Sequence, residues 1–249
     1  MKDKPSVIRE TDDDARTLAR TLLRGARFGT IAVLDPDTGF PNASRVLLAN
    51  APDGTPAILV SSLSAHTRAL QADSRCSLLT GEPGKGDPLA HPRLTIQAQA
   101  ETVERDSRMH GWLRARFLSR HPKAALYIDF GDFKFMLIRP VLASLNGGFG
   151  KAYSIPGSDL TLIHPDWERL ADEEENYLHA AMDEMPGIAN AIAKNNFHQT
   201  GNRWRICAVD TGGIDISAKE ILFRLEIPFT DMSQTRIFAD IRKVACLIP

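Results

Sequence analysis

Hydrophobic and polar residues alternate in several short runs of the N-terminal half, which is the pattern of half-buried β-strands. Stretches rich in Pro, Gly, Asn and Asp separate these runs, and turns this short join antiparallel neighbours. The strands predicted from this pattern are 28–34, 43–49, 57–61, 76–81, 93–103, 133–139 and 141–146. Six or more short, turn-linked strands favour a small closed or nearly closed β-barrel.

Apolar residues at helical spacing predict helices around this barrel and after it. The helical segments are 12–26, a short segment opening at His66, 106–120, 122–127, 166–185, 187–195 and 233–247. The last three lie beside predicted strands 204–209, 214–217 and 221–227. We therefore predict an α+β fold with a β-barrel domain over 1–153, a linker over 154–164 and a smaller α+β domain over 165–249.

Composition limits the classes of partner and compartment. The 249 residues are 43% hydrophobic and carry a net charge of −1, which gives no electrostatic footprint for nucleic acid or anionic lipid. The polar N-terminus carries no signal sequence, and no apolar run reaches membrane length. Cys76, Cys207 and Cys246 lie far apart, which argues against a disulfide framework or a structural zinc site. These features predict a cytoplasmic protein with no nucleic-acid partner, no membrane partner and no metal site.

The stretch 59–81 carries the clearest candidate chemistry. A strand delivers the hydroxyls of Ser61, Ser62 and Ser64 to the start of a helix that also carries Arg68. Unpaired amides and the dipole at a helix N-terminus attract anions, and an arginine adds a fixed charge. The segment is therefore either a phosphate site or a serine-capped helix on a surface loop.

Arg45 is a second candidate, because it interrupts the apolar strand 46–48. Burying an arginine is costly unless it meets an anion. Arg45 is therefore either an edge-strand residue that reaches solvent or part of the same anion site.

Catalytic machinery is not evident in the residue pattern. The seven histidines form neither an HExxH nor a His-x-His spacing, and no Gly-x-Ser-x-Gly elbow or Cys/His pairing is present. No catalytic residue is therefore assigned. The acidic run 172–175 is interpreted as the solvated start of a helix.

These segments carry a family resemblance. Residues 45–48, 61–68 and 93–97 resemble successive motifs of the FMN-binding split barrels related to pyridoxamine 5'-phosphate oxidase. Further segments resemble the haem-utilisation subgroup of HugZ type within that superfamily: 81–88, 116–117, 120–122, 131–133 and 146–152. Residues 165–249 resemble the C-terminal α+β domain often attached to those proteins.

The resemblance implies a split β-barrel that forms a homodimer and binds FMN or haem near the subunit interface. It implies a small-molecule cofactor or substrate and a flavoprotein linked to haem utilisation or degradation. We expect FMN to be held non-covalently, because no Cys or His stands in a recognisable attachment motif. The residues that it places around the FMN phosphate are Arg45, Ser64, His66, Thr67 and Arg68, with Arg93 nearby.

Two function classes stay open. One is an enzyme, either an FMN-dependent oxidoreductase or a haem-degrading oxygenase. The other is a non-catalytic binding module, which either carries haem or flavin or regulates tetrapyrrole metabolism. The His-Met-Asn-x-Asp-His motif of the related C-terminal domains is replaced here by residues 181–186, which contain no histidine. His91 and His164 are then the candidates for an iron ligand, against the alternative that no histidine binds iron.

Overall fold

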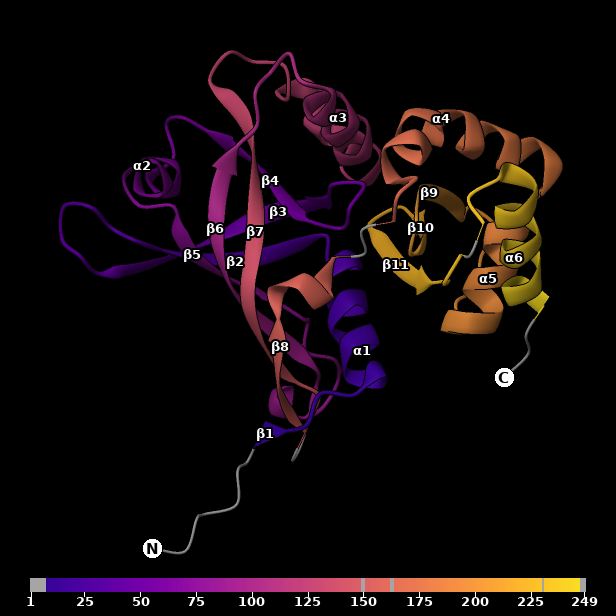
Figure 1. The fold of residues 1–249 in the computed structure, drawn as a ribbon, viewed down its shortest axis with the longest axis horizontal. Helices are drawn as coiled ribbons and strands as arrows, with labels where there is room; N and C mark the ends of the chain where they lie inside the picture. The colour runs from indigo at the N-terminus through magenta and orange to yellow at the C-terminus, as the bar shows by residue number, and fades with distance from the viewer. Residues whose placement is uncertain (1–7, 149–150, 162–163, 230, 247–249) are drawn as a thin grey trace, which may run out of the picture.

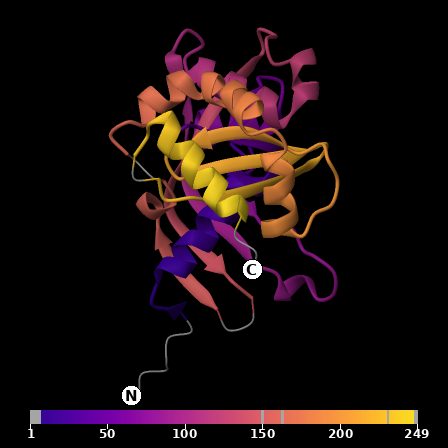
Figure 2. The same cartoon turned by 90° about the vertical axis from the view of Figure 1, so that its right-hand side faces the viewer.

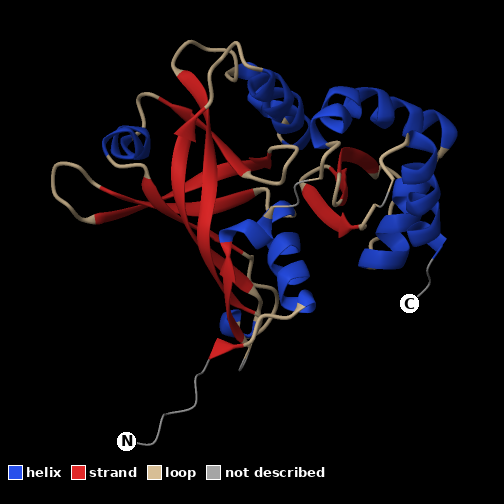
Figure 3. Ribbon diagram, in the orientation of Figure 1, coloured by secondary structure: helices blue, strands red, loops and turns tan. Residues whose placement is uncertain are grey.

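The computed structural model describes residues 8–148, 151–161, 164–229 and 231–246 of the chain. Figure 1 and Figure 3 show a β-barrel built from the N-terminal part and, beside it, a smaller sheet with its own helices. The α-helices are α1 (Asp13–Arg24), α2 (Ala65–Ala72), α3 (Arg108–Arg120), α4 (Trp167–Glu184), α5 (Ile188–Phe197) and α6 (Gln234–Cys246). Short 3-10 helices are η1 (Pro88–Ala90), η2 (Pro122–Leu126) and η3 (Gly157–Leu160). The predicted α+β fold class is confirmed.

Six strands close the barrel within the described residues. Their order is β7-β4-β3-β2-β5-β6, and β6 pairs with β7 again to close the ring. They are β2 (Phe28–Leu34), β3 (Pro41–Asn50), β4 (Pro56–Ser61), β5 (Arg75–Thr80), β6 (Arg93–Thr102) and β7 (Phe133–Asn146). All six pairings are antiparallel, as the short turns predict. Outside the ring, β8 (Ala152–Pro156) pairs with β7, and β1 (Ile8–Arg9) pairs with β8.

Alternation along the strands fills the barrel interior. In β2 the buried positions are Gly29, Ile31 and Val33, and the residues between them point outward. Helix α1 begins after Asp12, whose carboxylate accepts a hydrogen bond from the amide of Ala15 at 2.7 Å. Its apolar stripe joins the same core as the strands, so α1 is packed against the barrel.

The β7 region differs from the prediction. The sequence suggests two strands broken at Pro140, and this is wrong, because β7 runs unbroken from Phe133 to Asn146. The register against β6 shifts between Gln97 and Ala98, which leaves Val141 without a partner in the ladder. Proline cannot donate to the ladder and is tolerated at such a bulge.

The linker region also carries more structure than expected. Residues 154–160 lie in β8 and η3, and Ile155 and Leu160 are buried in the barrel core. Regular structure therefore continues through most of the segment 154–164, and the domain boundaries stay a prediction.

The C-terminal unit is built on a three-stranded antiparallel sheet in the order β11-β10-β9. Its strands are β9 (Arg205–Asp210), β10 (Gly213–Ala218) and β11 (Ile221–Glu226). Figure 2 shows α6 crossing one face of this sheet, and Figure 1 shows the other face turned toward the barrel. Alternation in β10 explains this layering. Ile214 and Ile216 join the core under the helices, while Asp215, between them in the strand, lies on the other face and meets Arg120 of α3.

Buried ion pairs join this unit to the barrel. Arg116 of α3 donates from Nε to the Glu174 carboxylate of α4 at 2.7 Å and from Nη2 to the Val209 carbonyl at 2.8 Å. The other carboxylate oxygen of Glu174 accepts the Val209 amide at 2.8 Å. The prediction that the acidic run 172–175 is solvated is therefore wrong at Glu174, which is buried because it meets this arginine.

A second group of buried charges continues the junction. Asp210 of β9 accepts from Arg224 of β11 at 2.7 and 3.0 Å and from Arg24 of α1 at 3.2 Å. Arg120 of α3 donates to Asp215 of β10, which also accepts from Arg224. Burial opposes ionisation of Asp210, yet Arg224 and Arg24 hold its pKa below the ordinary value. We call this set of eight residues the junction cluster: Arg24, Arg116, Arg120, Glu174, Asp210, Asp215, Arg224 and Glu226.

Gly54 allows Arg24 to enter this cluster. Its φ is +86°, and a Cβ at this position would lie 2.2 Å from Nη2 of Arg24. The turn at 51–54 therefore needs glycine both for its backbone conformation and for the space that the guanidinium occupies.

Candidate functional site

An open cavity of about 280 Å³ lies on the outside of the barrel, between strands β3 and β4 and the segments around α2, α3 and η2. Most of its wall is apolar or aromatic, and a few polar side chains reach it. The lining residues are Arg45, Val46, Leu47, Leu59, Val60, Ser61, Ser64, His66, Phe117, Tyr127 and Phe133. We call it the barrel cavity.

Arg45 reaches the barrel cavity because of the strand alternation. In β3 the buried positions are Val46 and Leu48, so Arg45 and Leu47 face outward. The Arg45 guanidinium lies 5.3 Å from the ring centroid of Phe28, where a cation–π contact orients it. Arg45 is therefore exposed, as in the first interpretation, and it also lines a cavity.

The serines around the start of α2 differ in the hydrogen bonds that they make. The Ser61 hydroxyl donates to the Asp132 carboxylate at 2.6 Å, and the Ser62 amide donates to the Asp132 carbonyl at 2.8 Å. Ser64 is the N-cap residue of α2, but its hydroxyl makes no capping hydrogen bond. The amides of Ala65 and His66 have no partner among the described residues. The helix start thus presents one hydroxyl and two amides that can bind an anion.

His66 lies half-buried in the wall of the cavity. Burial lowers the pKa of its imidazole below the ordinary value of 6.5, because a charged ring loses solvation there. The ring is therefore neutral at pH 7. No hydrogen bond joins it to another side chain or backbone group in the described parts of the chain.

The other predicted residues lie elsewhere. Thr67 is buried and donates its hydroxyl to the Ser61 carbonyl at 2.7 Å. The Arg68 guanidinium lies 3.0 Å from the Asp37 carboxylate in an exposed pair, and Ser62 is exposed in the loop. Arg93 lies at the opposite end of the barrel, since it pairs with Asn146, whereas Ser61 pairs with Phe133 at the start of β7.

Four of the eight predicted residues thus line one cavity in a single chain, and the others do not. The four are Arg45, Ser61, Ser64 and His66. As residues that bind a ligand, all eight stay predictions.

The aromatic wall was missed by the sequence reasoning. Tyr127 and Phe133 pack at 5.0 Å between ring centroids, and Phe117 meets Phe135 edge-on at 5.6 Å. The signal was present, since Phe117 and Phe133 belong to two of the motif segments that carry the HugZ-type resemblance. Nothing in the linear sequence, however, indicates that α3, η2 and β7 bring them to one wall.

Exposed apolar side chains occur in the segments that border the cavity. Leu63, Leu126 and Phe130 are 88%, 77% and 58% exposed. Hydrogen bonds from Ser61 and Ser62 to Asp132 join the segment that contains Leu63 to the segment that contains Phe130. Such a patch on an isolated chain indicates a surface that a ligand or another protein covers.

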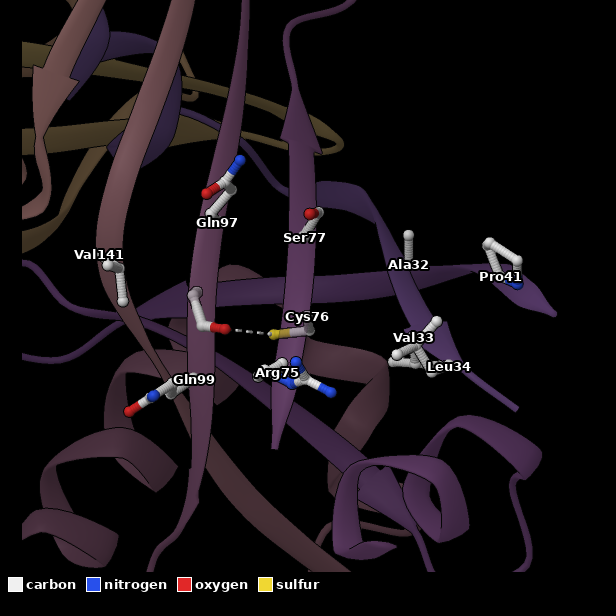
Figure 4. Close-up of a pocket in the computed structure, with 11 residues that line it drawn as sticks. Ala32, Val33, Leu34, Pro41, Arg75, Cys76, Ser77, Gln97, Gln99 and Val141 are labelled. Carbon is white, nitrogen blue, oxygen red and sulfur yellow. Dashed lines mark hydrogen bonds between the residues drawn. The ribbon is translucent and has the colours of Figure 1, made fainter. Parts of the chain in front are cut away.

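A second, larger groove of about 430 Å³ crosses the outer faces of β2, β5, β6 and β7. Figure 4 shows Gln97 and Gln99 beside Ser77 and Arg75 on the adjacent strand, with Val141 on the far side. In the same view the Cys76 thiol donates to a β6 carbonyl, that of Ala98, at 3.7 Å. None of the predicted site residues lines this groove.

The fold places the chain among known proteins. Residues 10–161, more than half of the chain, match the family described as the CREG β-barrel. The chain belongs to the CREG β-barrel family. The match covers α1 and the whole closed barrel, and it ends at η3, before the C-terminal unit.

Two other proteins are similar to this chain in sequence. The chain is 35% identical over 135 residues to the chloroplast heme oxygenase HOZ of Arabidopsis thaliana, which covers 54% of this chain and 40% of that protein. It is 29% identical over 125 residues to the heme oxygenase HutZ of Vibrio cholerae, which covers 49% of this chain and 70% of that protein. The chain therefore spans less than half the length of the plant relative.

Two solved structures extend the likeness over the C-terminal unit. Atu2129 of Agrobacterium tumefaciens, a protein of unknown function, is 28% identical with a TM-score of 0.77 and covers 97% of this chain and 99% of its own. A heme binding protein of Mycobacterium smegmatis is 24% identical with a TM-score of 0.56 over 95% of this chain and 98% of its own, which shows a shared fold. Both parts of this CREG-type chain therefore occur together in other proteins.

The described residues contain no group of three or more His, Cys, Asp or Glu side chains arranged to hold a metal ion. None of the helices in those residues is long and apolar enough to cross a membrane. The barrel cavity, with apolar walls, one cation and one neutral imidazole, is suited to a flat apolar ligand with an acidic edge.

Proposed function

We propose that this protein binds haem in the barrel cavity and serves haem utilisation. The observation that carries the proposal is the combination of aromatic walls with Arg45 at the same cavity. Haem is a flat apolar macrocycle with two carboxylates, so it needs a dry wall and a cation. Similarity to two proteins named as heme oxygenases supports this choice of ligand.

Different residues of the cavity would bind different parts of haem. Phe117, Tyr127 and Phe133 would pack against the macrocycle and exclude water from it. Arg45 would pair with a propionate through charge-assisted hydrogen bonds. The open shape of the cavity and the exposed Leu63 and Phe130 at its border would let part of a large ligand extend beyond the wall. Bound haem would supply an iron centre able to bind oxygen.

The proposal includes two alternatives for the fate of bound haem. The protein either degrades haem as an oxygenase or carries it as a non-catalytic, regulatory module. A reductant-driven assay separates them, because only the oxygenase would lose its Soret band in air.

Titration with haemin, followed by absorbance, tests the binding site when two matched variants are compared. Leu47→Trp places an indole in the cavity wall, whereas Leu79→Trp changes a similarly exposed leucine of β5 that does not line the cavity. We expect haem affinity to fall on the order of tenfold in Leu47→Trp, since an overpacked site excludes the macrocycle. Unchanged haem affinity in Leu47→Trp, or an equal loss in both variants, would show that haem does not bind in the barrel cavity.

FMN is the second candidate ligand, and a specific observation favours it. The Ser64 hydroxyl and the free amides of Ala65 and His66 could hold a phosphate beside Arg45. In that case the protein would be a flavoprotein oxidoreductase, and flavin itself would carry the hydride chemistry. The same titration with FMN tests this candidate, which fails if FMN shows no saturable binding.

The proposal also includes a homodimer formed through the barrel, with the cofactor near the subunit interface, as in the HugZ-type resemblance. The support is the set of exposed apolar residues in the segments that border the barrel cavity: Leu63, Leu126 and Phe130. An interface over these residues would bring the cofactor close to the partner subunit. Sedimentation should give a dimer at micromolar concentration, and Phe130→Glu should give a monomer. A monomer in the unchanged protein removes the dimer.

Two finer expectations from the sequence belong to the same proposal. A cytoplasmic location agrees with three cysteines that are all free in this structure. A C-terminal unit of the kind attached to HugZ-type proteins agrees with the sheet and helices observed after residue 164.

A further inference from the structure

The histidines of the chain differ in what their ring nitrogens contact. His91 has Nε2 2.9 Å from the carbonyl oxygen of Lys85 in its own loop, and its ring packs against Gly84. The Nδ1 atom of His164 accepts the amide of Asp166 at 3.1 Å. Both loop histidines that the sequence suggested as iron ligands thus use a ring nitrogen within their own segment.

Three further histidines are also set in local surroundings. His121 is buried with Nε2 2.8 Å from the Leu48 carbonyl oxygen. The His110 ring meets Phe135 edge-on at 5.3 Å. His198 ends α5 with a left-handed φ of 53°. None of the three lines the barrel cavity.

His179 and His66 remain. His179 is exposed on α4, in a separate cleft of about 600 Å³ between α3, α4 and β9 that also contains the carboxylates of Asp172 and Glu175. Three arginines also line this cleft, but each of them is already engaged: Arg114 with Asp129, Arg116 with Glu174 and Arg205 with Ser119. The cleft therefore offers acids and no unpaired cation to haem propionates. His66 lies in the barrel cavity instead, among aromatic residues and with Arg45.

We propose that His66 would hold the iron of haem in the barrel cavity through its imidazole. This deepens the haem proposal and rests on it. Three observations support the assignment: the ring lies in an apolar wall, neither nitrogen is engaged within the described residues, and its cavity supplies a cation for a propionate. A neutral imidazole is a competent haem ligand, and burial keeps this one neutral by lowering its pKa.

Tyr127 is the competing ligand, because its phenol lines the same cavity and tyrosinate can bind haem iron. It would first have to lose its proton. A neutral imidazole needs no such step, which favours His66 over Tyr127.

The experiment compares haemin with iron-free protoporphyrin IX, which shares the macrocycle and carboxylates but offers no iron. In His66→Ala we expect haemin affinity to fall by about tenfold or more, since even indirect disturbance of a metal ligand has that effect. The Soret maximum should shift, and added imidazole should restore it. Protoporphyrin IX affinity should stay within about twofold of the unchanged protein, since the aromatic wall and Arg45 remain.

Two control variants complete the design. His179→Ala, at a residue outside the barrel cavity, should keep the haemin spectrum of the unchanged protein. Tyr127→Phe tests the competing ligand, because it removes the phenol oxygen and keeps the aromatic ring. A spectrum that survives His66→Ala, or that changes in Tyr127→Phe instead, overturns the assignment while haem binding itself stands. Failure of the unchanged protein to bind haemin overturns the proposed function, so the two failures are distinguishable.

Discussion

Two regions of this protein use arginine in opposite ways, and α3 separates them. Arg116 and Arg120 of α3 are buried in the junction cluster, where each meets a carboxylate. Phe117, between them, faces the barrel cavity, where Arg45 is exposed and forms no ion pair with a described residue. Cations that are fully paired hold the two parts of the chain together, whereas an unpaired cation stays available to a ligand.

The energetic consequences differ as well. A buried pair gains little over an apolar core, yet the loss of one partner is costly, because it leaves a charge that burial prevents from being solvated. An exposed arginine can be removed at almost no cost to the fold. Substitutions in the two regions should therefore separate stability from binding.

The largest effect is expected at the centre of the junction cluster. Arg224→Met removes the guanidinium that Asp210, Asp215 and Glu226 share, and we expect the free energy of unfolding to fall by about 3–5 kcal/mol. This corresponds to a melting temperature lower by roughly 6–20 °C. The control is Arg236→Met, which breaks a surface pair with Asp240 and should cost less than about 1 kcal/mol. Similar shifts in melting temperature in both variants would contradict the assignment of the junction cluster as a main source of stability.

Acid should weaken the fold through a residue between the two regions. His121 packs on Phe117 at 4.8 Å and follows Arg120 in the chain, and burial lowers its pKa from 6.5 to about 4. Between these pH values the unfolded chain binds a proton that the folded chain does not, so stability falls as the pH falls. Integrated over this window, His121 accounts for up to about 3 kcal/mol.

Urea unfolding between pH 7 and 4 measures this slope. His121→Gln should reduce it, although His66 and His110 shift in the same direction and keep part of it. The exposed His179→Gln should leave the slope unchanged. A slope as steep in His121→Gln as in the unchanged protein would show that the buried imidazole is not its source.

In the barrel cavity the effect should fall on binding instead. Arg45→Ala removes a charge-assisted contact, and we expect haem affinity to fall by roughly tenfold to a hundredfold, or about 1.5–3 kcal/mol. The melting temperature without ligand should not change, because Arg45 has no buried partner. Calorimetry measures the melting temperature, and haemin titration on the same sample measures the affinity. A loss of stability without a loss of affinity would show that Arg45 supports the fold and not the ligand.

The smallest effect is expected at Arg68, where the sequence suggested a phosphate contact. Its pair with Asp37 is exposed on both sides, so Arg68→Ala should alter stability by less than about 1 kcal/mol. Haem affinity should change by less than about fivefold. If haemin titration instead gives a loss as large as that of Arg45→Ala, the haem site in solution includes Arg68.

The sequence predicts the strands of the barrel well, because alternation and turn residues are local signals. The strand predicted at 28–34 matches β2 residue for residue. Contacts between distant segments leave no such signal. Asp37 follows β2 and Arg68 lies in α2, so their pairing depends on a turn reaching across the barrel surface. In the same way, a glutamate in an acidic run looks solvated until Arg116 is found beside it.

The position of the junction cluster has a consequence for how such chains change over evolution. The family match ends at residue 161, whereas Glu174, Asp210 and Asp215 all lie beyond it. The ion pairs of Arg24, Arg116 and Arg120 with these acids therefore form only in a chain that also carries the C-terminal unit. We expect the two sets to be inherited together, and a barrel that lost its C-terminal unit should replace the three arginines by uncharged residues. An alignment of barrels with and without this unit would record that covariation.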